Sequence, residues 1–293
     1  MTLPSPDPTL GVLYVVASPL GNPGDFSPRA VSTLGAADVV FAEDTRTARR
    51  LCEAHGIEPP LRSCFDANEE ERAIEAAALL TEGKSVALLS EAGTPAVSDP
   101  GFRIVRAAIA AGARVVPVPG PSAVLAALVA SGLPTDRFIF IGFPPRKSGA
   151  RQALFARLRT LPASLILYES PHRVAETLQD LVTVLGADRP ACLARELTKT
   201  HEEVVRGPLG VLLERYSAQR PLGEITLVVG GLSEELEVEA VDDPAVAERA
   251  RRLLAGGYST RDTAEILAVE TDRGRKETYA LVLSLSRAEG AKS

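Results

Sequence analysis

The chain has 293 residues, of which 45% are hydrophobic and 24% charged, a composition that excludes a disordered or fibrous protein. No apolar run approaches the length that crosses a membrane, and the first residues, MTLPSPDPTL, lack the basic and apolar parts of a signal peptide. The formal net charge of −6 argues against a uniformly basic nucleic-acid-binding protein, and three scattered cysteines and three histidines predict reduced thiols, a cytoplasmic location and no metal site.

The first part of the chain alternates strands, loops and helices. Residues 11–17 (GVLYVVA) form a short apolar run that is typical of a buried parallel strand, and a loop rich in Gly and Pro follows, then a helix through Leu34. Short connections between such elements predict a mostly parallel sheet with both faces covered. Further strands are predicted at 37–42, 85–89 and 113–118, and further helices at 47–55, 67–81 and 102–111.

After residue 122 the pattern changes. An apolar helix at 122–131 precedes strands at 138–142, 164–169, 191–196 and 224–230, with helices near 150–159 and 174–185. The segment SEELEVEAVDD holds six acidic residues and no basic one, which is typical of a solvated linker. Helical periodicity at 244–254, 261–268 and 275–285, with Gly256-Gly257 between the first two, favours a helix-turn-helix module. We therefore predict an N-terminal Rossmann-like α/β domain at 1–119, a second α/β domain at 120–232, an acidic linker at 233–243 and the helical module at 244–293.

Three loops rich in small residues follow predicted strands. They are SPLGNPGD after the first strand, SEAGTPAVSDPG after residue 89, and VPGPS at 118–122. Ligands of open α/β sheets bind at such strand ends. The first loop has neither the GxGxxG pattern nor a Walker lysine, which disfavours nucleotide triphosphates. Plain turns are the alternative interpretation of the first two loops, and helix capping by Ser122 is the alternative for the third.

Seven motifs occur in order along the chain: VASPLGNPGD, FAEDTR, LLSEAGTPAVSDPG, VPGPSAVLAALVASGL, YESPHR, RELTKTHEEVVRG and GEITLVV. Together they resemble the tetrapyrrole methylase superfamily and, within it, the ribosomal RNA small-subunit methyltransferase I subfamily of ribose 2′-O-methyltransferases. The terminal helices are similar to that subfamily's helix-turn-helix appendage. The resemblance implies a two-domain α/β homodimer that binds S-adenosylmethionine (SAM) between its domains and methylates a cytidine of 16S rRNA in the small ribosomal subunit.

The resemblance also implies which residues contact the cofactor. Many relatives have Gly-Asp-Pro in the second loop, where this chain has Gly93-Thr94-Pro95 and so lacks that carboxylate. The positions that match cofactor contacts are Leu20, Ala92, Gly93, Thr94, Val97, Ser122 and Ala123, with Tyr168, Gly223 and Glu224 expected by position to complete the pocket.

Methyl transfer to a hydroxyl needs alignment of the reacting atoms and gains from a base that accepts the hydroxyl proton. Candidate catalytic groups lie at the ends of predicted strands. A structural alternative exists for two pairs: Asp44 with Arg46 can form an ion pair, and so can Glu196 with Lys199, which lie one helical turn apart. The candidates are Glu43, Asp44, Arg46, Glu91, Glu196 and Lys199.

The stretch 144–159 contains five basic residues and no acidic one. It favours contacts to RNA phosphates through Arg146, Lys147 and Arg151, and a solvated helix face is the alternative. The helical module, with nine basic and seven acidic residues, is a second candidate contact to RNA.

Two rival functions remain open at this point. One is a tetrapyrrole (precorrin-type) methyltransferase, which would use the same cofactor with another acceptor. The other is a ligand-sensing DNA-binding regulator, which the terminal helices favour.

Overall fold

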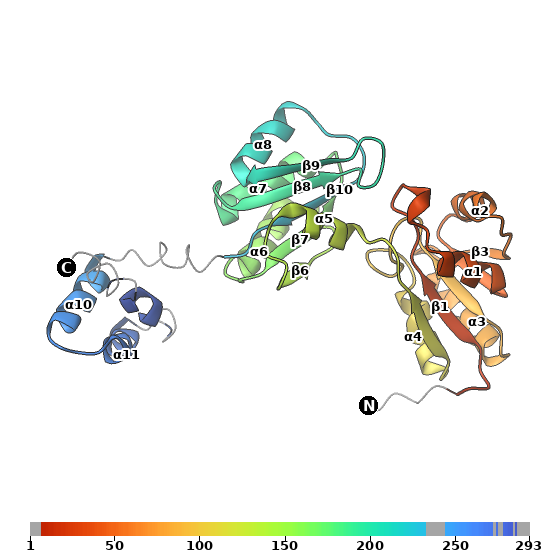
Figure 1. The fold of residues 1–293 in the computed structure, drawn as a ribbon, viewed down its shortest axis with the longest axis horizontal. Coiled ribbons are helices and arrows are strands. Elements are labelled where there is room, and N and C mark those ends of the chain that lie inside the picture. The colour runs from red at the N-terminus through yellow and green to blue at the C-terminus, as the bar shows by residue number, and fades with distance from the viewer. Residues whose placement is uncertain (1–6, 233–243, 272–273, 275–277, 284, 286–293) are drawn as a thin grey trace. The chain divides into compact units, whose positions relative to one another are not determined.

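The computed structural model describes residues 7–232, 244–271, 274, 278–283 and 285. The chain divides into two compact units, Met1–Leu158 with Ser164–Gly230, and Arg159–Ala163 with Gly231–Ser293. The first unit holds two five-stranded sheets, and the second holds the C-terminal helices (Figure 1). None of the described helices is long and apolar enough to cross a membrane.

The N-terminal sheet is parallel throughout. Its strand order is β3-β2-β4-β1-β5, so that β4, β1 and β5 are neighbours. Every residue of β2 and β4 is buried, because a sheet with both faces covered leaves its strands no solvent side. The strands are β1 (Val12–Val16), β2 (Val39–Ala42), β3 (Leu61–Ser63), β4 (Val86–Leu89) and β5 (Arg114–Val118), and the helices are η1 (Pro23–Asp25), α1 (Pro28–Ala36), α2 (Thr45–Ala54), α3 (Glu69–Thr81) and α4 (Phe102–Ala110).

Two hydrophobic clusters hold this sheet between its helices. Leu13 and Phe41 pack with the buried residues of α3 and α4, whereas Val16 and Val40 pack with those of α1 and α2. The strands β1 and β2 thus each supply both clusters. The sequence analysis missed β3, because its three residues, LRS, carry no apolar or alternating pattern.

The second sheet is mixed, with the order β6-β7-β10-β8-β9. The strands β6 and β7 are parallel, whereas β10 runs antiparallel to both β7 and β8, and β9 is antiparallel to β8. The last strand in sequence thus lies at the centre. The elements are α5 (Ala123–Ser131), β6 (Phe138–Phe140), α6 (Ser148–Leu158), β7 (Ser164–Glu169), α7 (Val174–Leu185), β8 (Pro190–Arg195), β9 (Glu203–Pro208), α8 (Leu209–Ala218) and β10 (Ile225–Val229).

Sequence analysis left β9 and α8 unassigned. The strand ends at Pro208 and the helix begins at Leu209, so no separate turn segment lies between them to mark either boundary. Burial shows what they contribute: Leu209, Leu212 and Tyr216 of α8 pack into the main core of this sheet.

The C-terminal unit contains α10 (Pro244–Ala255), α11 (Thr260–Thr271) and a helical segment at 278–283. Ala250 and Leu253 of α10 share a hydrophobic cluster with Leu267 and Val282. Gly257, with φ of 88°, supplies the left-handed residue that ends α10. The first two predicted helices are therefore present, the third is described only at 278–283 and 285, and their helix-turn-helix arrangement stays a prediction. The predicted linker at 233–243 lies outside the described residues.

Candidate active site

The loops that follow β1, β4 and β5 contact one another. Ser18 and Gly93 exchange two backbone hydrogen bonds, with N···O distances of 2.9 and 3.1 Å. The Thr94 hydroxyl donates to the Pro121 carbonyl over 3.3 Å. Because β4, β1 and β5 are adjacent parallel strands, their carboxyl ends lie at one edge of the sheet. The strand order therefore gathers the three loops that the sequence analysis singled out.

Two glycines allow this close approach. A Cβ on Gly120 would lie 3.0 Å from the Cβ of Ala17, and one on Gly93 would lie 3.2 Å from Leu20 Cδ2. Gly93 also has a φ of 80°, which side-chain-bearing residues rarely adopt. The predicted contact residues Leu20 and Gly93 are thus in contact with each other.

Left-handed backbone at non-glycine residues marks two loops. Ala96 and Ser98, with φ of 64° and 65°, lie in the loop after β4, and Glu196 and Thr198, with φ of 50° and 67°, lie in the turn after β8. Among the described residues no other non-glycine position has a positive φ. Such a conformation costs ~1–2 kcal/mol per residue and persists only where its surroundings impose it. Both loops contain predicted site residues: Val97 lies between Ala96 and Ser98, and Glu196 is itself one of them.

Ser122 precedes α5 but does not cap it with its side chain. Its backbone carbonyl accepts from the Ala126 N–H over 2.9 Å, and its hydroxyl makes no capping hydrogen bond. The capping interpretation of Ser122 is therefore wrong. The hydroxyl remains available to a ligand at the start of α5, where Ala123 is the first helical residue.

Glu196, Lys199 and Glu224 form a closed network. The Lys199 ammonium lies 2.9 Å from Glu196 Oε1 and 3.2 Å from Glu224 Oε2, and Glu196 Oε1 also accepts from the Glu224 N–H over 3.0 Å. That backbone hydrogen bond, followed by the one from Lys199, lowers the pKa of Glu196. Burial works against the charge of Lys199, but hydrogen bonds to both carboxylates outweigh it and raise the pKa of Lys199. A carboxylate held in this way is a poor proton acceptor, so the network is suited to positioning.

Two further observations fix this turn. A Cβ on Gly223, which has a φ of 85°, would lie 2.2 Å from Glu196 Cδ, so a larger residue would displace that side chain from its place in the network. The Asn22 N–H donates to Thr198 Oγ1 over 3.2 Å, which joins the turn after β8 to the loop after β1. Residues far apart in sequence, including the predicted Gly223 and Glu224, are thereby brought beside the first loop.

Asp44 and Arg46 form an ion pair, which is the structural alternative to a catalytic role for these two residues. Their closest N···O distance is 2.7 Å, and Asp44 also accepts from the Arg46 backbone N–H at the start of α2. Hydrogen bonds from Arg46 lower the pKa of Asp44 to about 2. Asp44 is therefore a helix cap that stays ionised, and a weak base.

Four carboxylates gather near the ends of β2 and β4. Glu43 and Glu91 line the same depression. Burial, followed by repulsion from Glu91 and Asp66, raises the pKa of Glu43. Burial raises the pKa of Asp99 to about 7, and the charges of Glu43, Glu91 and Asp66 add to the shift. A cationic ligand among these groups would favour their ionised forms, because an opposite charge lowers the pKa of a carboxyl group.

Sequence analysis missed Asp99, although it lies in the SEAGTPAVSDPG loop. The loop marks the region, but no sequence pattern indicates that burial and four other carboxylates perturb the pKa of this group in particular. Among the described residues no cluster of His, Cys, Asp and Glu side chains has the geometry of a metal site.

Tyr168, a predicted contact residue at the end of β7, lies among aromatic rings. Its ring centroid is 4.9 Å from that of Phe140 and 5.6 Å from that of Phe143. Burial raises the pKa of Tyr168 to about 12, with a smaller contribution from Asp99, so its hydroxyl keeps its proton. Phe143 is 57% exposed, an unusual position for a phenylalanine ring, and sequence analysis missed it.

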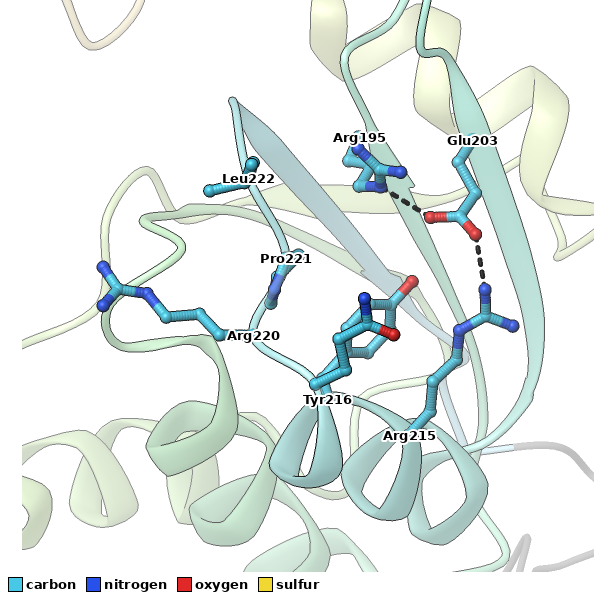
Figure 2. Close-up of a pocket in the computed structure, with 8 residues that line it drawn as sticks. Arg195, Glu203, Arg215, Tyr216, Arg220, Pro221 and Leu222 are labelled. Carbon is cyan, nitrogen blue, oxygen red and sulfur yellow. Dashed lines mark hydrogen bonds and ion pairs between the residues drawn. The ribbon is translucent and has the colours of Figure 1, made fainter.

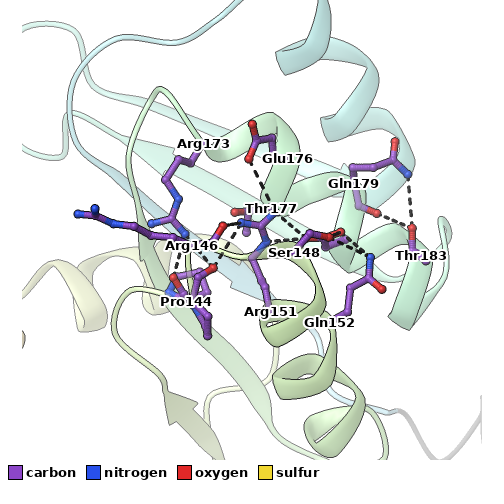
Figure 3. Close-up of polar contacts among 12 residues, drawn as sticks. Pro144, Arg146, Ser148, Arg151, Gln152, Arg173, Glu176, Thr177, Gln179 and Thr183 are labelled. Carbon is purple, nitrogen blue, oxygen red and sulfur yellow. Dashed lines mark hydrogen bonds and ion pairs between the residues drawn. The ribbon is translucent and has the colours of Figure 1, made fainter.

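Arg151 does not lie on the surface. It is 1% exposed, its guanidinium lies 3.9 Å from the Glu176 carboxylate (Figure 3), and it binds Asp180 with N···O distances of 2.6 Å. It also donates to the carbonyls of Pro145 and Arg146. The expectation that Arg151 contacts RNA is thus corrected: its charge is used to hold the loop before α6 against α7. Arg146 and Lys147 are both exposed.

Similarity to known proteins identifies the family of the chain. The family model described as "Tetrapyrrole (Corrin/Porphyrin) Methylases" matches residues 12–213. The chain belongs to this tetrapyrrole methylase family. Two relatives named "Ribosomal RNA small subunit methyltransferase I" are 42% identical over 94% of this chain and 99% of the relative (Synechocystis sp.) and 45% identical over 95% and 93% (Mesorhizobium japonicum). Family and relatives confirm the predicted methyltransferase class.

Solved structures confirm the fold class. The methyltransferase CobJ superposes with a TM-score of 0.58 at 21% identity, covering 75% of this chain and 94% of that one. The uroporphyrin-III C-methyltransferase of Thermus thermophilus, complexed with S-adenyl homocysteine, superposes with a TM-score of 0.53 at 19% identity, covering 74% and 97%. At these identities the likeness concerns the α/β fold with its two sheets.

Proposed function

We propose that this protein transfers a methyl group to the ribose 2′-hydroxyl of a cytidine in 16S rRNA of the small ribosomal subunit. One observation carries the proposal: relatives named for ribosomal RNA small-subunit methylation match more than nine-tenths of the chain at 42–45% identity. SAM is the methyl donor, consistent with the family and with the bound S-adenyl homocysteine of the solved relative.

The candidate site suits this cofactor. The Ser122 hydroxyl, which does not cap α5, provides a polar group at the edge of the sheet where the three loops meet. A sulfonium is a cation, and the site gathers Glu43, Glu91 and Asp99, of which the last has a pKa of about 7. Binding a cation there offsets the mutual repulsion of these groups. We assign the remaining matched positions, Leu20, Ala92, Thr94, Val97, Ala123, Tyr168, Gly223 and Glu224, to the same pocket.

SAM supplies an activated methyl group, so the residues of the chain mainly align the acceptor oxygen with it and accept a proton. Glu43 is the catalytic candidate that the geometry favours as proton acceptor, because burial raises its pKa and makes it a stronger base. Glu91 and Asp99 supply negative charge beside it. Glu196 and Lys199 position the turn that carries Glu224.

The RNA is held, in this proposal, by the loop that precedes α6. Arg146 and Lys147 are exposed there and can neutralise phosphates. Phe143, 57% exposed beside Tyr168, offers a face on which an unpaired base can stack. The C-terminal helices at 244–293 provide a second contact, and their deletion should weaken RNA affinity while sparing SAM binding.

The proposal also includes the oligomeric state, the location and the domain boundaries of the protein. Leu125 and Val129 of α5 are 51% and 74% exposed, and an apolar helix face of this kind is consistent with a homodimer. Sedimentation of the purified protein tests it. We also propose a cytoplasmic location and the domain boundaries after residues 119, 232 and 243.

Labelled SAM tests the function directly. Small ribosomal subunits from cells that lack the protein should accept the label, and mass analysis of the RNA fragments should place it on one cytidine ribose. Transfer of the label to a precorrin instead of RNA would favour a tetrapyrrole acceptor. Transfer to neither would favour the rival function of a ligand-sensing DNA-binding regulator.

A Glu43→Gln variant tests the proton acceptor. We expect kcat to fall by about 10²–10⁴-fold while the SAM Kd changes little, because the variant keeps shape and loses the base. Asp44→Asn is the matched control: it removes a neighbouring carboxylate that is already paired with Arg46, and kcat should stay within a few-fold. Equal losses in both variants would contradict the assignment.

A further inference from the structure

A cavity of about 330 Å³ lies in the second sheet's part of the molecule, outside the site described above (Figure 2). Its volume is at the lower end of the range for small-ligand sites and suits a group of nucleotide size. The wall is formed by the end of β8, the start of β9 and the segment from α8 to β10. The lining residues are Arg195, Glu203, Arg215, Tyr216, Gln219, Arg220, Pro221 and Leu222.

The lining is positively charged. Three of its residues are arginines, and Glu203 is the single carboxylate among the lining residues. Arg195 and Arg215 both bind Glu203, as Figure 2 shows, so that the carboxylate bridges the two guanidiniums and is satisfied by them. The C-terminal end of α8 adds about half a negative charge. The balance remains clearly positive, and guanidinium groups match the oxygens of a phosphate in paired hydrogen bonds.

Two polar groups at the cavity have no partner among the described residues. Arg220 is exposed, its side chain forms no ion pair or hydrogen bond within the described residues, and it extends away from Glu203 in Figure 2. Tyr216 is 5% exposed, and its buried hydroxyl makes no hydrogen bond there. Leaving a hydroxyl buried without a partner costs ~1–3 kcal/mol. Burial raises the pKa of Tyr216, so this group stays protonated and can donate to an anion.

The cavity is next to the candidate active site along the chain. Arg195 immediately precedes Glu196, and Leu222 immediately precedes Gly223, both of which belong to that site. Leu222 is 76% exposed at the rim, where an apolar side chain can contact a ribose or a base. The cavity therefore adjoins, along the chain, the turns that carry Glu196 and Glu224 of the candidate site.

We propose that the cavity binds a backbone phosphate of the RNA substrate, close to the nucleotide that is methylated. The proposal rests on RNA being the acceptor, as proposed above. Arg220 and the free edges of Arg195 and Arg215 grip the phosphate oxygens, and the Tyr216 hydroxyl donates to one of them.

The test uses the full-length protein and a short, labelled oligocytidylate RNA. Arg220→Ala removes an unpaired exposed charge, and Arg114→Ala, an exposed arginine of β5 far along the chain, removes the same charge as the matched control. RNA affinity is measured at several salt concentrations, and its logarithm is plotted against the logarithm of the salt concentration. The slope of this plot should be less steep by about 0.7 for Arg220→Ala, the value for one lost phosphate contact on a single strand. The slope of Arg114→Ala should equal that of the wild type.

Tyr216→Phe separates binding from folding. It removes an unpartnered hydroxyl, so the urea midpoint should stay unchanged or rise, while RNA affinity falls about tenfold through loss of a hydrogen bond to a charged group. Wild-type RNA affinity in both Arg220→Ala and Tyr216→Phe would overturn the proposal. So would a change confined to the sedimentation coefficient, which would assign the cavity to contacts between copies of the chain.

Further arms distinguish the source of the phosphate and the proposed function. Cytidine 5′-monophosphate should bind the wild type more tightly than cytidine does, and this difference should become smaller in Tyr216→Phe. Binding of inorganic phosphate without any loss of RNA affinity in the variants would overturn the RNA assignment. If small subunits accept no methyl group but the variants still lose RNA affinity, the phosphate site stands and the proposed reaction fails. SAM affinity should be unchanged in both variants.

Discussion

The carboxylates at the strand ends predict that SAM binds more tightly as the pH rises through neutrality. Burial, followed by the charges of four other carboxylates, raises the pKa of Asp99 to about 7. A raised carboxyl pKa means that the group is neutral below that pH and negative above it. About one-tenth of Asp99 is therefore ionised at pH 6 and about nine-tenths at pH 8. If the sulfonium binds chiefly beside the ionised form, the affinity for SAM rises up to about tenfold over this range, which is ~1.4 kcal/mol.

Calorimetry with SAM and with S-adenosylhomocysteine at pH 6, 7 and 8 measures this effect. The second compound has the same amino acid and nucleoside parts but a neutral thioether, so the ratio of the two affinities isolates the sulfonium charge. The ratio should rise with pH in the wild type and stay nearly level in Asp99→Asn, which is neutral at every pH. A ratio that is constant from pH 6 to pH 8 in the wild type would refute the electrostatic reasoning.

Three further predictions concern stability and RNA binding. Arg151→Met should lower the free energy of unfolding by about 3–5 kcal/mol in urea titrations, because it leaves the buried carboxylate of Asp180 without its partner; a loss below 1 kcal/mol would show that the pair is dispensable. Gly101→Ala should cost about 1–3 kcal/mol by the same measurement, since its φ is 133° and its new Cβ would lie 2.3 Å from Leu88 Cδ2; an unchanged midpoint would contradict the strain. Phe143→Ala should weaken oligocytidylate binding by ~1–3 kcal/mol in anisotropy titrations and leave SAM affinity unchanged, since only base stacking is lost; equal RNA affinity would remove Phe143 from the interface.

Local patterns in the sequence were sufficient for the elements of the N-terminal sheet and for the family. Buried parallel strands are continuous apolar runs, and loops at their ends are rich in Gly and Pro, so both can be recognised over a few residues. The motifs that carry the resemblance are likewise contiguous. The sequence alone therefore places the three loops in one site and predicts α10 and α11 where they occur.

Long-range pairing and burial were decided by the tertiary structure. The sequence shows no reason why β10, the last strand, lies between β7 and β8, because register depends on partners that are remote in the chain. In the sequence, Arg151 does not differ from the other residues of a basic run. Its burial and its ion pair follow only from contact with Asp180, which lies on another helix.

The same holds for the chemistry of the site. The residue types of Asp99, Ser122 and Tyr216 were visible from the start, but their properties depend on what surrounds them: a pKa near 7, a hydroxyl that does not cap its helix, and a hydroxyl buried without a partner. Sequence thus determined which groups are present and in which local elements. Folding decided which groups lose water and which charges they face, because desolvation and Coulomb interactions depend on distances that only the packed structure defines.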